Sequence, residues 1–323
     1  MRMVKVLELS GFQEEHKRAM PEGVDVVYTT PSDVTLEQVA EAEVVIGRVP
    51  MEMLPYAKKL KWIQLDTAGS ETYAKEGVLP DGCILSNATG SFGMAIAEYL
   101  LCTILMLMRN MNLYVRNQLQ GKWEMCGPIS SIYGSTFLII GMGDLGSEFA
   151  YRVQALGGKV LGVRKHPKVS VEGIEKMYGM EQIPDIIGEA DVVVLALPST
   201  KETRRSFHKE YFGLMKKTAI LANVGRGDVL YTEELLEAVQ HKEIAGAILD
   251  VCDQEPIPVD HPIWKEENII ITPHISGTFQ LPKTYERFVR IALSNLQAYL
   301  AGEPLRNVVE VGIGYRRIDT AIK

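Results

Sequence analysis

The sequence predicts an α/β fold built from two doubly wound parallel sheets. Short apolar runs alternate with helical patterns along almost all of the 323 residues. Most of these runs are continuous stretches of Val, Ile and Leu, which is typical of strands covered on both faces. A stretch rich in Gly, Ser, Pro and aromatic residues at 121–135 separates two series of such runs. The length also fits two domains.

Each series supplies the strands of one predicted sheet, because strands that alternate with helices build βαβ units. The predicted strands of the first series are Val4–Leu9, Val24–Tyr28, Val44–Gly47, Trp62–Leu65 and Cys83–Ser86. Those of the second are Thr136–Ile140, Lys159–Val163, Asp191–Leu197, Ala219–Val224, Ala245–Val251 and Ile269–Thr272.

Two long helices accompany the strands. One is predicted over residues 92–120, where it bridges the two series. Its segment Tyr99–Met108 is apolar on all sides, so we expect it to be buried in a core or an oligomer interface. This segment is shorter than the roughly 20 residues that span a bilayer, and we expect no membrane insertion. A second, amphipathic helix is predicted over Thr284–Ala301, and a polar tail without a clear pattern follows it.

The charge and the cysteines exclude several classes of protein. The chain carries 34 basic and 41 acidic residues, a net charge of −7, whereas generic nucleic-acid binders are usually basic. Cys83, Cys102, Cys126 and Cys252 form no CxxC pair or zinc-binding pattern, so we expect reduced thiols and no metal site. The N-terminus has no signal-peptide pattern. We therefore expect a cytoplasmic protein.

A glycine-rich turn indicates a dinucleotide site. Residues 141–146 read Gly-Met-Gly-Asp-Leu-Gly, with a predicted strand before them and a predicted helix, Ser147–Leu156, after them. G-x-G-x-x-G alone is a weak signal, but between a strand and a helix it allows a pyrophosphate to approach the backbone and the helix N-terminus. The expected cofactor-binding residues here are Gly141, Gly143, Asp144, Leu145 and Gly146.

The end of the next predicted strand indicates which dinucleotide is bound. An acidic residue about 20 positions beyond the last glycine would accept the ribose 2′-hydroxyl of NAD. Arg164 and Lys165 stand there instead, followed by His166. Basic side chains can pair with a 2′-phosphate, which favours NADP(H) over NAD(H). A solvated basic loop would read the same way.

Three ionisable residues follow consecutive predicted strands and therefore share the carboxyl edge of one sheet. They are Arg226, Glu255 and His274. An arginine can clamp a carboxylate in two-pronged fashion, and a histidine can donate a proton near neutral pH, with a carboxylate to orient its ring. Singly, each has an ordinary structural explanation. Together, beyond a dinucleotide motif, they indicate reduction of a 2-oxo acid.

At this point the sequence resembles the D-isomer-specific 2-hydroxyacid dehydrogenases over essentially its whole length. The resemblance rests on five motifs in order: GMGDLG at 141–146, ALPSTKET at 196–203, NVGRGDVL at 223–230, DVCDQEP at 250–256 and TPHISG at 272–277. It implies two Rossmann-like domains. It also implies that Arg226, Glu255 and His274 are the catalytic residues.

The resemblance implies further features. The substrate domain would be discontinuous, 1–100 plus 288–323, around a dinucleotide domain at 101–287, with the active site in the cleft between them. Backbone amides of Ala68 and Gly69, in DTAGS at Asp66–Ser70, would bind the substrate carboxylate. The protein would be a homodimer whose two subunits are joined through the helix at 92–120. Further cofactor contacts are implied at Pro198, Thr203, Val224, Asp250 and Gly277.

Arg164 stands where NAD-dependent members of this family have an acidic residue that binds the ribose 2′-hydroxyl. In this the sequence resembles the NADP-preferring glyoxylate and hydroxypyruvate reductases. Glu255 argues against formate dehydrogenase, which is similar but has Gln there, and the length argues against phosphoglycerate dehydrogenases with an appended regulatory domain. Two alternatives stay open: an NAD-linked D-lactate or isocaproate-type dehydrogenase, and a nucleotide-sensing, co-repressor-like binding protein. Arg48, at a strand end, could bind an anionic substrate tail, or it could equally be an arginine of a surface loop. Other candidates for the substrate pocket, each of which could equally be a core residue, are Val49, Met51, Leu54, Tyr73, Trp123 and Phe279.

Overall fold

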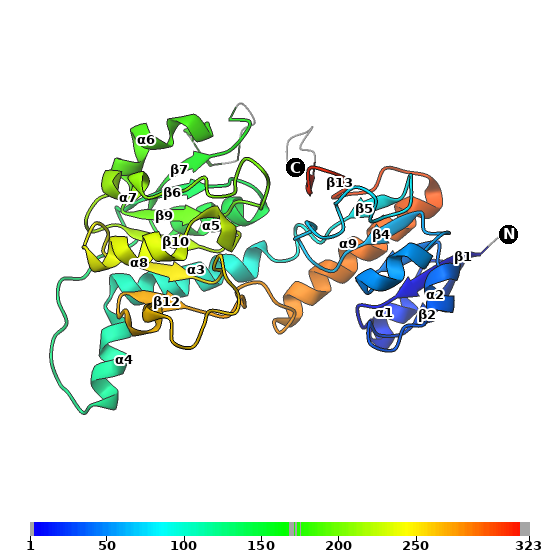
Figure 1. Ribbon diagram of the computed structural model, residues 1–323, viewed down its shortest axis with the longest axis horizontal. Helices are drawn as coiled ribbons and strands as arrows, with labels where there is room; N and C mark the ends of the chain where they lie inside the picture. Colours follow the sequence, from blue (N-terminus) through cyan, green and yellow to red (C-terminus); the bar gives the residue numbers. More distant parts are fainter. Residues whose placement is uncertain (1–2, 168–170, 172, 175, 317–323) are drawn as a thin grey trace. The chain divides into compact units, whose positions relative to one another are not determined.

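The structure is a computed structural model that describes residues 3–167, 171, 173–174 and 176–316 (Figure 1). The chain forms two compact units. Of the described residues, unit 1 contains 3–92 and 279–316, and unit 2 contains those within Gly93–Thr278. The chain therefore leaves unit 1, builds unit 2 and returns.

The unit boundaries differ from the predicted domains, 1–100 plus 288–323 and 101–287. Residues 93–100 belong to unit 2 because they are the first turns of a helix that packs there, and residues 279–287 belong to unit 1.

Unit 1 is a five-stranded parallel sheet in the order β2-β1-β3-β4-β5. This is the flavodoxin-like order, in which the switch point lies between β1 and β3. The buried side chains of Leu7, Val45 and Ile63 form its core. The strands are β1 (Val4–Glu8), β2 (Val24–Tyr28), β3 (Val44–Ile46), β4 (Trp62–Gln64) and β5 (Ile84–Ser86). The helices are α1 (Glu14–Arg18), α2 (Leu36–Glu41), a 3₁₀ helix at Met51–Tyr56, and α9 (Pro282–Ala301).

A buried polar network fastens the returning helix α9 to this sheet. Asn295 on α9 is 1% exposed, and its amide nitrogen donates to Gln64 Oε1 at 2.8 Å and to the Arg306 carbonyl at 3.1 Å. The Asn295 side-chain oxygen accepts the Arg306 amide at 2.8 Å. Gln64 Oε1 also accepts the hydroxyl of Ser86. Because the side chains of Asn295, Gln64 and Ser86 are buried, the network fixes the position of α9 along the sheet.

Unit 2 is a seven-stranded parallel sheet in the order β12-β11-β10-β9-β6-β7-β8. Its first six strands follow the dinucleotide-binding order, with the switch point between β6 and β9. The strands are β6 (Thr136–Ile140), β7 (Lys159–Val163), β8 (Met177–Tyr178), β9 (Val192–Leu195), β10 (Ile220–Asn223), β11 (Gly246–Leu249) and β12 (Ile269–Ile271). The α-helices are α3 (Gly93–Met108), α4 (Met111–Leu119), α5 (Asp144–Ala155), α6 (Ile183–Ile186), α7 (Glu210–Leu214) and α8 (Thr232–Gln240). Short 3₁₀ helices lie at Met180–Gln182, Ile187–Glu189, Gly227–Val229 and Pro262–Lys265.

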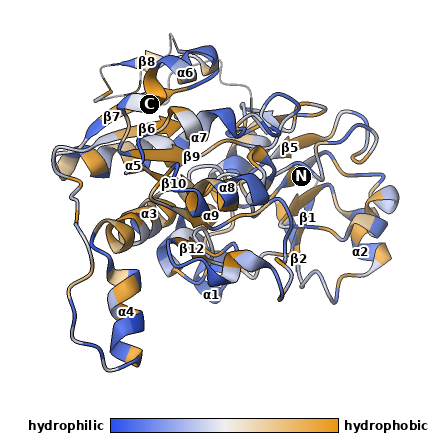
Figure 2. Cartoon of the chain, turned by 60° about the vertical axis from the view of Figure 1, so that its left-hand side comes forward, coloured by the Kyte–Doolittle hydropathy of each residue, from blue (hydrophilic) through white to orange (hydrophobic). Residues whose placement is uncertain are grey.

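The strands of unit 2 bury side chains on both faces, as their continuous apolar runs predict. On β9, Val192 and Val194 belong to the core beneath α3 and α5, whereas Val193 and Leu195 belong to the opposite core beneath α7 and α8. Successive strand residues point to opposite faces, so a strand between two cores needs an apolar residue at every position. Figure 2 shows this hydrophobic character in the central strands and in α3.

The predicted single helix at 92–120 is wrong. Asn110 adopts φ 55° and separates α3 from α4, which are bent by 69° relative to each other. The Asn110 side chain donates to the carbonyls of Cys126 and Pro128 at 2.6 and 3.0 Å, and so holds the segment that runs back from α4. Asn tolerates the left-handed region better than most residues, which explains why the break falls there.

Three smaller features also differ from prediction. Helix α5 begins at Asp144, within the glycine-rich turn, and not at Ser147. Strand β8, of two residues, was not predicted because it is too short to show periodicity. The tail predicted to lack a pattern pairs β13 (Val309–Glu310) antiparallel with β14 (Tyr315–Arg316).

Among the described residues, no single helix has the length and apolar character to span a membrane, and only α3 and α4 taken together pass that test.

We expect Asn295→Ala to lower the free energy of unfolding of unit 1 by about 2 to 4 kcal/mol, because it removes the hydrogen bonds that the buried Asn295 side chain makes to Gln64 and to the backbone of Arg306. Urea titration followed by Trp62 fluorescence would measure this. Gln297→Ala, at an exposed position of the same helix, is the control and should change stability by less than about 0.5 kcal/mol. Equal effects of the two substitutions would contradict the role of the network.

Candidate active site

The glycine-rich turn lies at the switch point of unit 2. Gly141 has φ 111°, and a Cβ there would lie 2.4 Å from the carbonyl oxygen of Ala196 at the end of β9. A Cβ on Gly146 would lie 2.3 Å from the Gly141 carbonyl oxygen, so α5 packs directly on the turn. Gly143 precedes the first residue of this 12-residue helix. Exposed backbone N–H groups at a helix start suit a pyrophosphate, and the turn therefore fits a dinucleotide.

The end of β7 carries the predicted selectivity residues. Arg164 is 6% exposed and its amide donates to the Tyr178 carbonyl at 3.0 Å, which ties it to β8. Lys165 is exposed. The Thr200 hydroxyl, its own backbone amide and the nearby Lys165 hold the pKa of Glu202 below its usual range. Lys165 therefore lies near the 196–203 loop, whereas the burial of Arg164 was not predicted.

The loop after β9 folds back on itself through Thr203. Its hydroxyl donates to the Pro198 carbonyl at 2.5 Å and accepts the Thr200 amide at 2.8 Å. Ser199 donates to Asp228 at 2.6 Å, beside the Arg226 turn. Pro198 and Thr203, predicted cofactor contacts, therefore belong to a turn at the same sheet edge as Gly141.

Asn223, at the end of β10, shapes the turn that carries Arg226. It is fully buried, its side-chain nitrogen donates to the Arg226 carbonyl at 3.0 Å, and its oxygen accepts the Gly225 amide at 3.2 Å. The Arg226 guanidinium donates to the Gly225 carbonyl at 2.8 Å. A Cβ on Gly227 would lie 1.8 Å from the Cys252 carbonyl oxygen, so this turn presses against the turn after β11. Our sequence reasoning passed over Asn223 as a site residue, although a polar residue ending an apolar strand is a signal.

Glu255 and His274 form the predicted pair. His274 Nδ1 lies 3.0 Å from Glu255 Oε2, and Glu255 Oε1 accepts the Cys252 amide at 2.9 Å. Because a carboxylate only accepts, it selects the tautomer with hydrogen on Nδ1 and leaves Nε2 for another partner. The His274 side chain is 54% exposed and the Glu255 side chain is 39% exposed. The pair is therefore accessible to a ligand.

Asp250, at the end of β11, holds the loop that contains His274. Its carboxylate, 2% exposed, accepts the Thr272 hydroxyl at 2.6 Å and the amides of Ile275 and Ser276 at 2.8 and 3.0 Å. The Ser276 hydroxyl also donates to it. The other predicted cofactor residues after these strands differ in burial: Val224 is 5% exposed, and Gly277 and Leu145 are half-buried.

The predicted substrate loop lies in unit 1, after β4. The carbonyls of Ala68 and Gly69 accept the Asn87 amide and the Thr67 hydroxyl, each at 2.7 Å. No hydrogen bond of the described residues uses the amides of Ala68 or Gly69. Arg48 Nε lies 2.7 Å from Asp66 Oδ1 and is 55% exposed. The loop thus leaves backbone donors for an anion, whereas its place in a cleft between units stays a prediction.

Most of the other predicted pocket residues are structural. Tyr73 donates to the Val49 carbonyl at 2.6 Å, and burial raises the pKa of Tyr73 to about 12. Phe279 stacks on Phe92 with ring centroids 5.4 Å apart. Apolar side chains at strand ends fill a core as readily as a pocket, so the core alternative accounts for the contacts of Tyr73. Val49 and Leu54 are core residues, whereas Met51 and Trp123 are exposed.

One group of metal-ligand type occurs among the described residues, at Glu15, His16 and Glu286 in unit 1. His16 Nδ1 accepts the Gln13 amide at 3.1 Å, so the hydrogen of the neutral ring is on Nε2, 3.1 Å from Glu286 Oε1. A nitrogen that carries hydrogen is not a metal ligand. The arrangement is therefore accounted for by hydrogen bonding.

Comparison with known proteins identifies the family. The profile described as "D-isomer specific 2-hydroxyacid dehydrogenase, NAD binding domain" matches residues 101–276. The glyoxylate reductase of Korarchaeum cryptofilum is 30% identical over 290 residues, which cover 85% of each chain. A family protein of Aeromonas salmonicida has a structure with TM-score 0.84 and 30% identity, covering 95% of this chain and 99% of that one. Another, from Xanthobacter autotrophicus in complex with NADPH and MES, has TM-score 0.82 and 26% identity over 98% and 100%. The chain belongs to the D-isomer specific 2-hydroxyacid dehydrogenases, a family of NAD(P)-dependent oxidoreductases.

Proposed function

We propose that this enzyme reduces a 2-oxo acid to a D-2-hydroxy acid with NADPH. The observation that carries the proposal is the hydrogen-bonded pair of His274 and Glu255, on the same sheet edge as the glycine-rich turn and Arg226. The bound cofactor supplies a hydride to the carbonyl carbon. The glyoxylate reductase relative supports a small 2-oxo acid as substrate.

Arg226 binds the substrate and polarises it. Its guanidinium can hold a carboxylate by two parallel hydrogen bonds and can stabilise the charge that develops on the carbonyl oxygen. Asn223 and the close approach at Gly227 fix the backbone that carries this side chain. We assign the free amides of Ala68 and Gly69 to the same carboxylate.

His274 supplies the proton. Glu255 holds hydrogen on Nδ1, so a protonated ring presents its second hydrogen, on Nε2, to the developing alkoxide. Before the transfer, the Glu255 carboxylate stabilises the positively charged ring. After the transfer, the neutral ring keeps its hydrogen bond from Nδ1 to Glu255. Oxidation of the hydroxy acid uses the same groups in reverse.

Replacing the proton donor tests this proposal. His274→Gln should lower kcat for glyoxylate reduction by about 10²- to 10⁴-fold, because the alkoxide loses its acid. NADPH affinity, measured by fluorescence titration, should change by less than about threefold. His208→Gln, an exposed histidine elsewhere in unit 2, is the control and should keep wild-type turnover. Full activity of His274→Gln would contradict the assignment.

We also propose a preference for NADP(H). The support is the basic pair Arg164 and Lys165, which stands at the end of β7 in place of the acidic residue that would bind a ribose 2′-hydroxyl. The related structure in complex with NADPH supports it further. The exposed ammonium of Lys165 is free of the burial that constrains Arg164. Lys165 is therefore the better position for a charge change that leaves the fold intact.

Lys165→Asp should lower the ratio of kcat/KM for NADPH to that for NADH by about 10- to 100-fold, because it removes a charge-assisted hydrogen bond and adds repulsion. Arg164→Gln should shift the ratio in the same direction. Lys159→Asp, at the opposite end of β7, makes the same charge change away from the site and should leave the ratio within about twofold. If the ratio stayed unchanged in both Lys165→Asp and Arg164→Gln, the proposed role of the basic pair would be contradicted.

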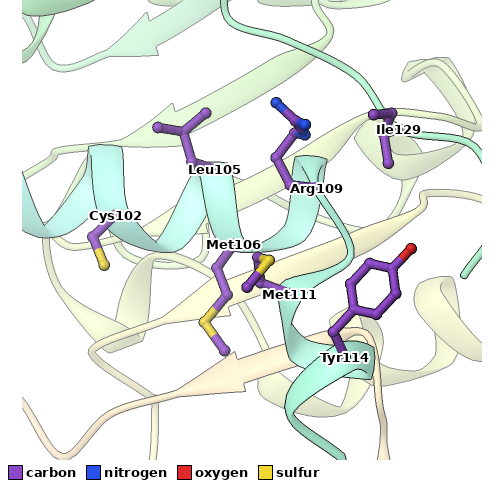
Figure 3. A pocket seen from close by; sticks show the side chains of 7 residues that line it. All are labelled: Cys102, Leu105, Met106, Arg109, Met111, Tyr114 and Ile129. Carbon is purple, nitrogen blue, oxygen red and sulfur yellow. The ribbon is translucent and has the colours of Figure 1, made fainter. Parts of the chain in front are cut away.

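We propose that the enzyme is a homodimer joined through α3 and α4. An open hollow of about 570 Å³ lies along these helices (Figure 3). Leu119, the last residue of α4, and Trp123 and Met125, on the segment that follows, are 85%, 102% and 94% exposed. Apolar side chains gathered in this way are typical of an interface. The hollow is lined by Cys102, Leu105, Met106, Arg109, Met111, Tyr114 and Ile129.

Light scattering coupled to size exclusion should give the mass of a dimer for the wild type at micromolar concentration. Leu105→Glu combined with Met111→Glu should shift the population to monomer, because it places charge in an apolar interface. Leu214→Glu, at an exposed apolar position on α7, is the control and should remain dimeric. A monomeric wild type would contradict the proposal.

A further inference from the structure

We propose that Tyr99 and Thr272 are positioning residues for the reaction, which hold His274 in place through the carboxylate of Asp250. The inference rests on the proposed role of His274 as proton donor. All four residues belong to unit 2: Tyr99 lies on α3, and the other three follow β11 and β12.

The acceptor capacity of Asp250 is fully used by the protein. A carboxylate has about four lone-pair sites. Oδ1 accepts the Thr272 hydroxyl and the Ile275 amide, and Oδ2 accepts the amide and the hydroxyl of Ser276. The family resemblance made Asp250 a cofactor contact, but this arrangement makes its carboxylate an anchor for residues 272–276.

The anchor determines the backbone at His274. The His274 amide donates to the carbonyls of Asp250 and Thr272 at 2.9 and 3.0 Å. His274 has φ 55°, in the left-handed region that a side chain with a Cβ rarely adopts. Such a conformation persists only where surrounding contacts impose it. The ring can therefore meet Glu255 only while Asp250 holds both flanks of the loop.

Tyr99 completes the chain of hydrogen bonds from α3. Its hydroxyl lies 2.7 Å from Thr272 Oγ1. Thr272 gives its only hydroxyl hydrogen to Asp250, so Tyr99 must be the donor to Thr272. Burial raises the pKa of Tyr99 to about 12, and the phenol therefore keeps this hydrogen throughout the neutral range. The Tyr99 hydroxyl orients the Thr272 hydroxyl, which in turn donates to the Asp250 carboxylate that holds the His274 loop.

Hydrogen–deuterium exchange and steady-state kinetics on the full-length enzyme test this relay. Tyr99→Phe should speed amide exchange in the peptide spanning 272–277 by about three- to tenfold and lower kcat by a similar factor, because one buried hydrogen bond is lost. KM for glyoxylate and the Kd of NADPH should stay within about twofold. Thr272→Val should have at least the effect of Tyr99→Phe, because it also removes the bond to Asp250, whereas Thr272→Ser should keep wild-type values. The double variant should be no worse than Thr272→Val alone, since that substitution already removes the bond to Tyr99.

Tyr151→Phe is the matched control, because Tyr151 is 72% exposed on α5. It should change neither exchange nor kcat. Unchanged exchange at 272–277 in Tyr99→Phe, or additive losses in the double variant, would overturn the relay. If the wild-type enzyme reduced no 2-oxo acid, the proposed function would be contradicted. The exchange measurement needs no substrate, so it would still test the relay.

Discussion

Close backbone packing at the carboxyl edge of the seven-stranded sheet is the constraint on which the site depends. Parallel strands bring all their carboxyl ends to one edge, and three contacts there leave no space for a Cβ: Gly141 against Ala196, Gly225 against Leu197, and Gly227 against Cys252. The turns after β6, β9, β10 and β11 consequently lie within backbone contact of one another. The glycine-rich turn and the turns that carry Arg226 and Glu255 are therefore positioned by the same packing that closes the sheet edge.

The two units contribute different chemistry. Unit 2 carries the charged groups, Arg226, Glu255 and His274, on turns fixed by buried polar residues such as Asn223 and Asp250. Unit 1 offers backbone amides at Ala68 and Gly69, with their carbonyls already engaged. Its integrity depends on residues far along the chain, since α9 returns and is fastened through Asn295. The loss of a buried contact in α9 would thus reach the substrate loop through the stability of unit 1.

The sequence was sufficient for the strands and for the pairing of Glu255 with His274, because continuous apolar runs and residue types at strand ends are local signals. It was not sufficient where a single side chain decides the path of the backbone. The break at Asn110 depends on its bonds to Cys126 and Pro128, which no periodicity predicts. The amide of Arg164 is bonded to the two-residue strand β8, which is too short to show periodicity. For Val49 and Tyr73 the sequence leaves a pocket and a core equally open, because both have the same composition, and the structure buries both side chains.

The central claim is that hydride reaches a 2-oxo carbon while His274 protonates its oxygen. The most direct measurement uses NADPH that carries deuterium at both hydrogens of nicotinamide C4, in ordinary water, with glyoxylate and with pyruvate. Mass spectrometry and chiral chromatography of the products should find one deuterium at C2, and the pyruvate product should be the D isomer. Deuterium absent from C2, or L-lactate as the product, would contradict the account.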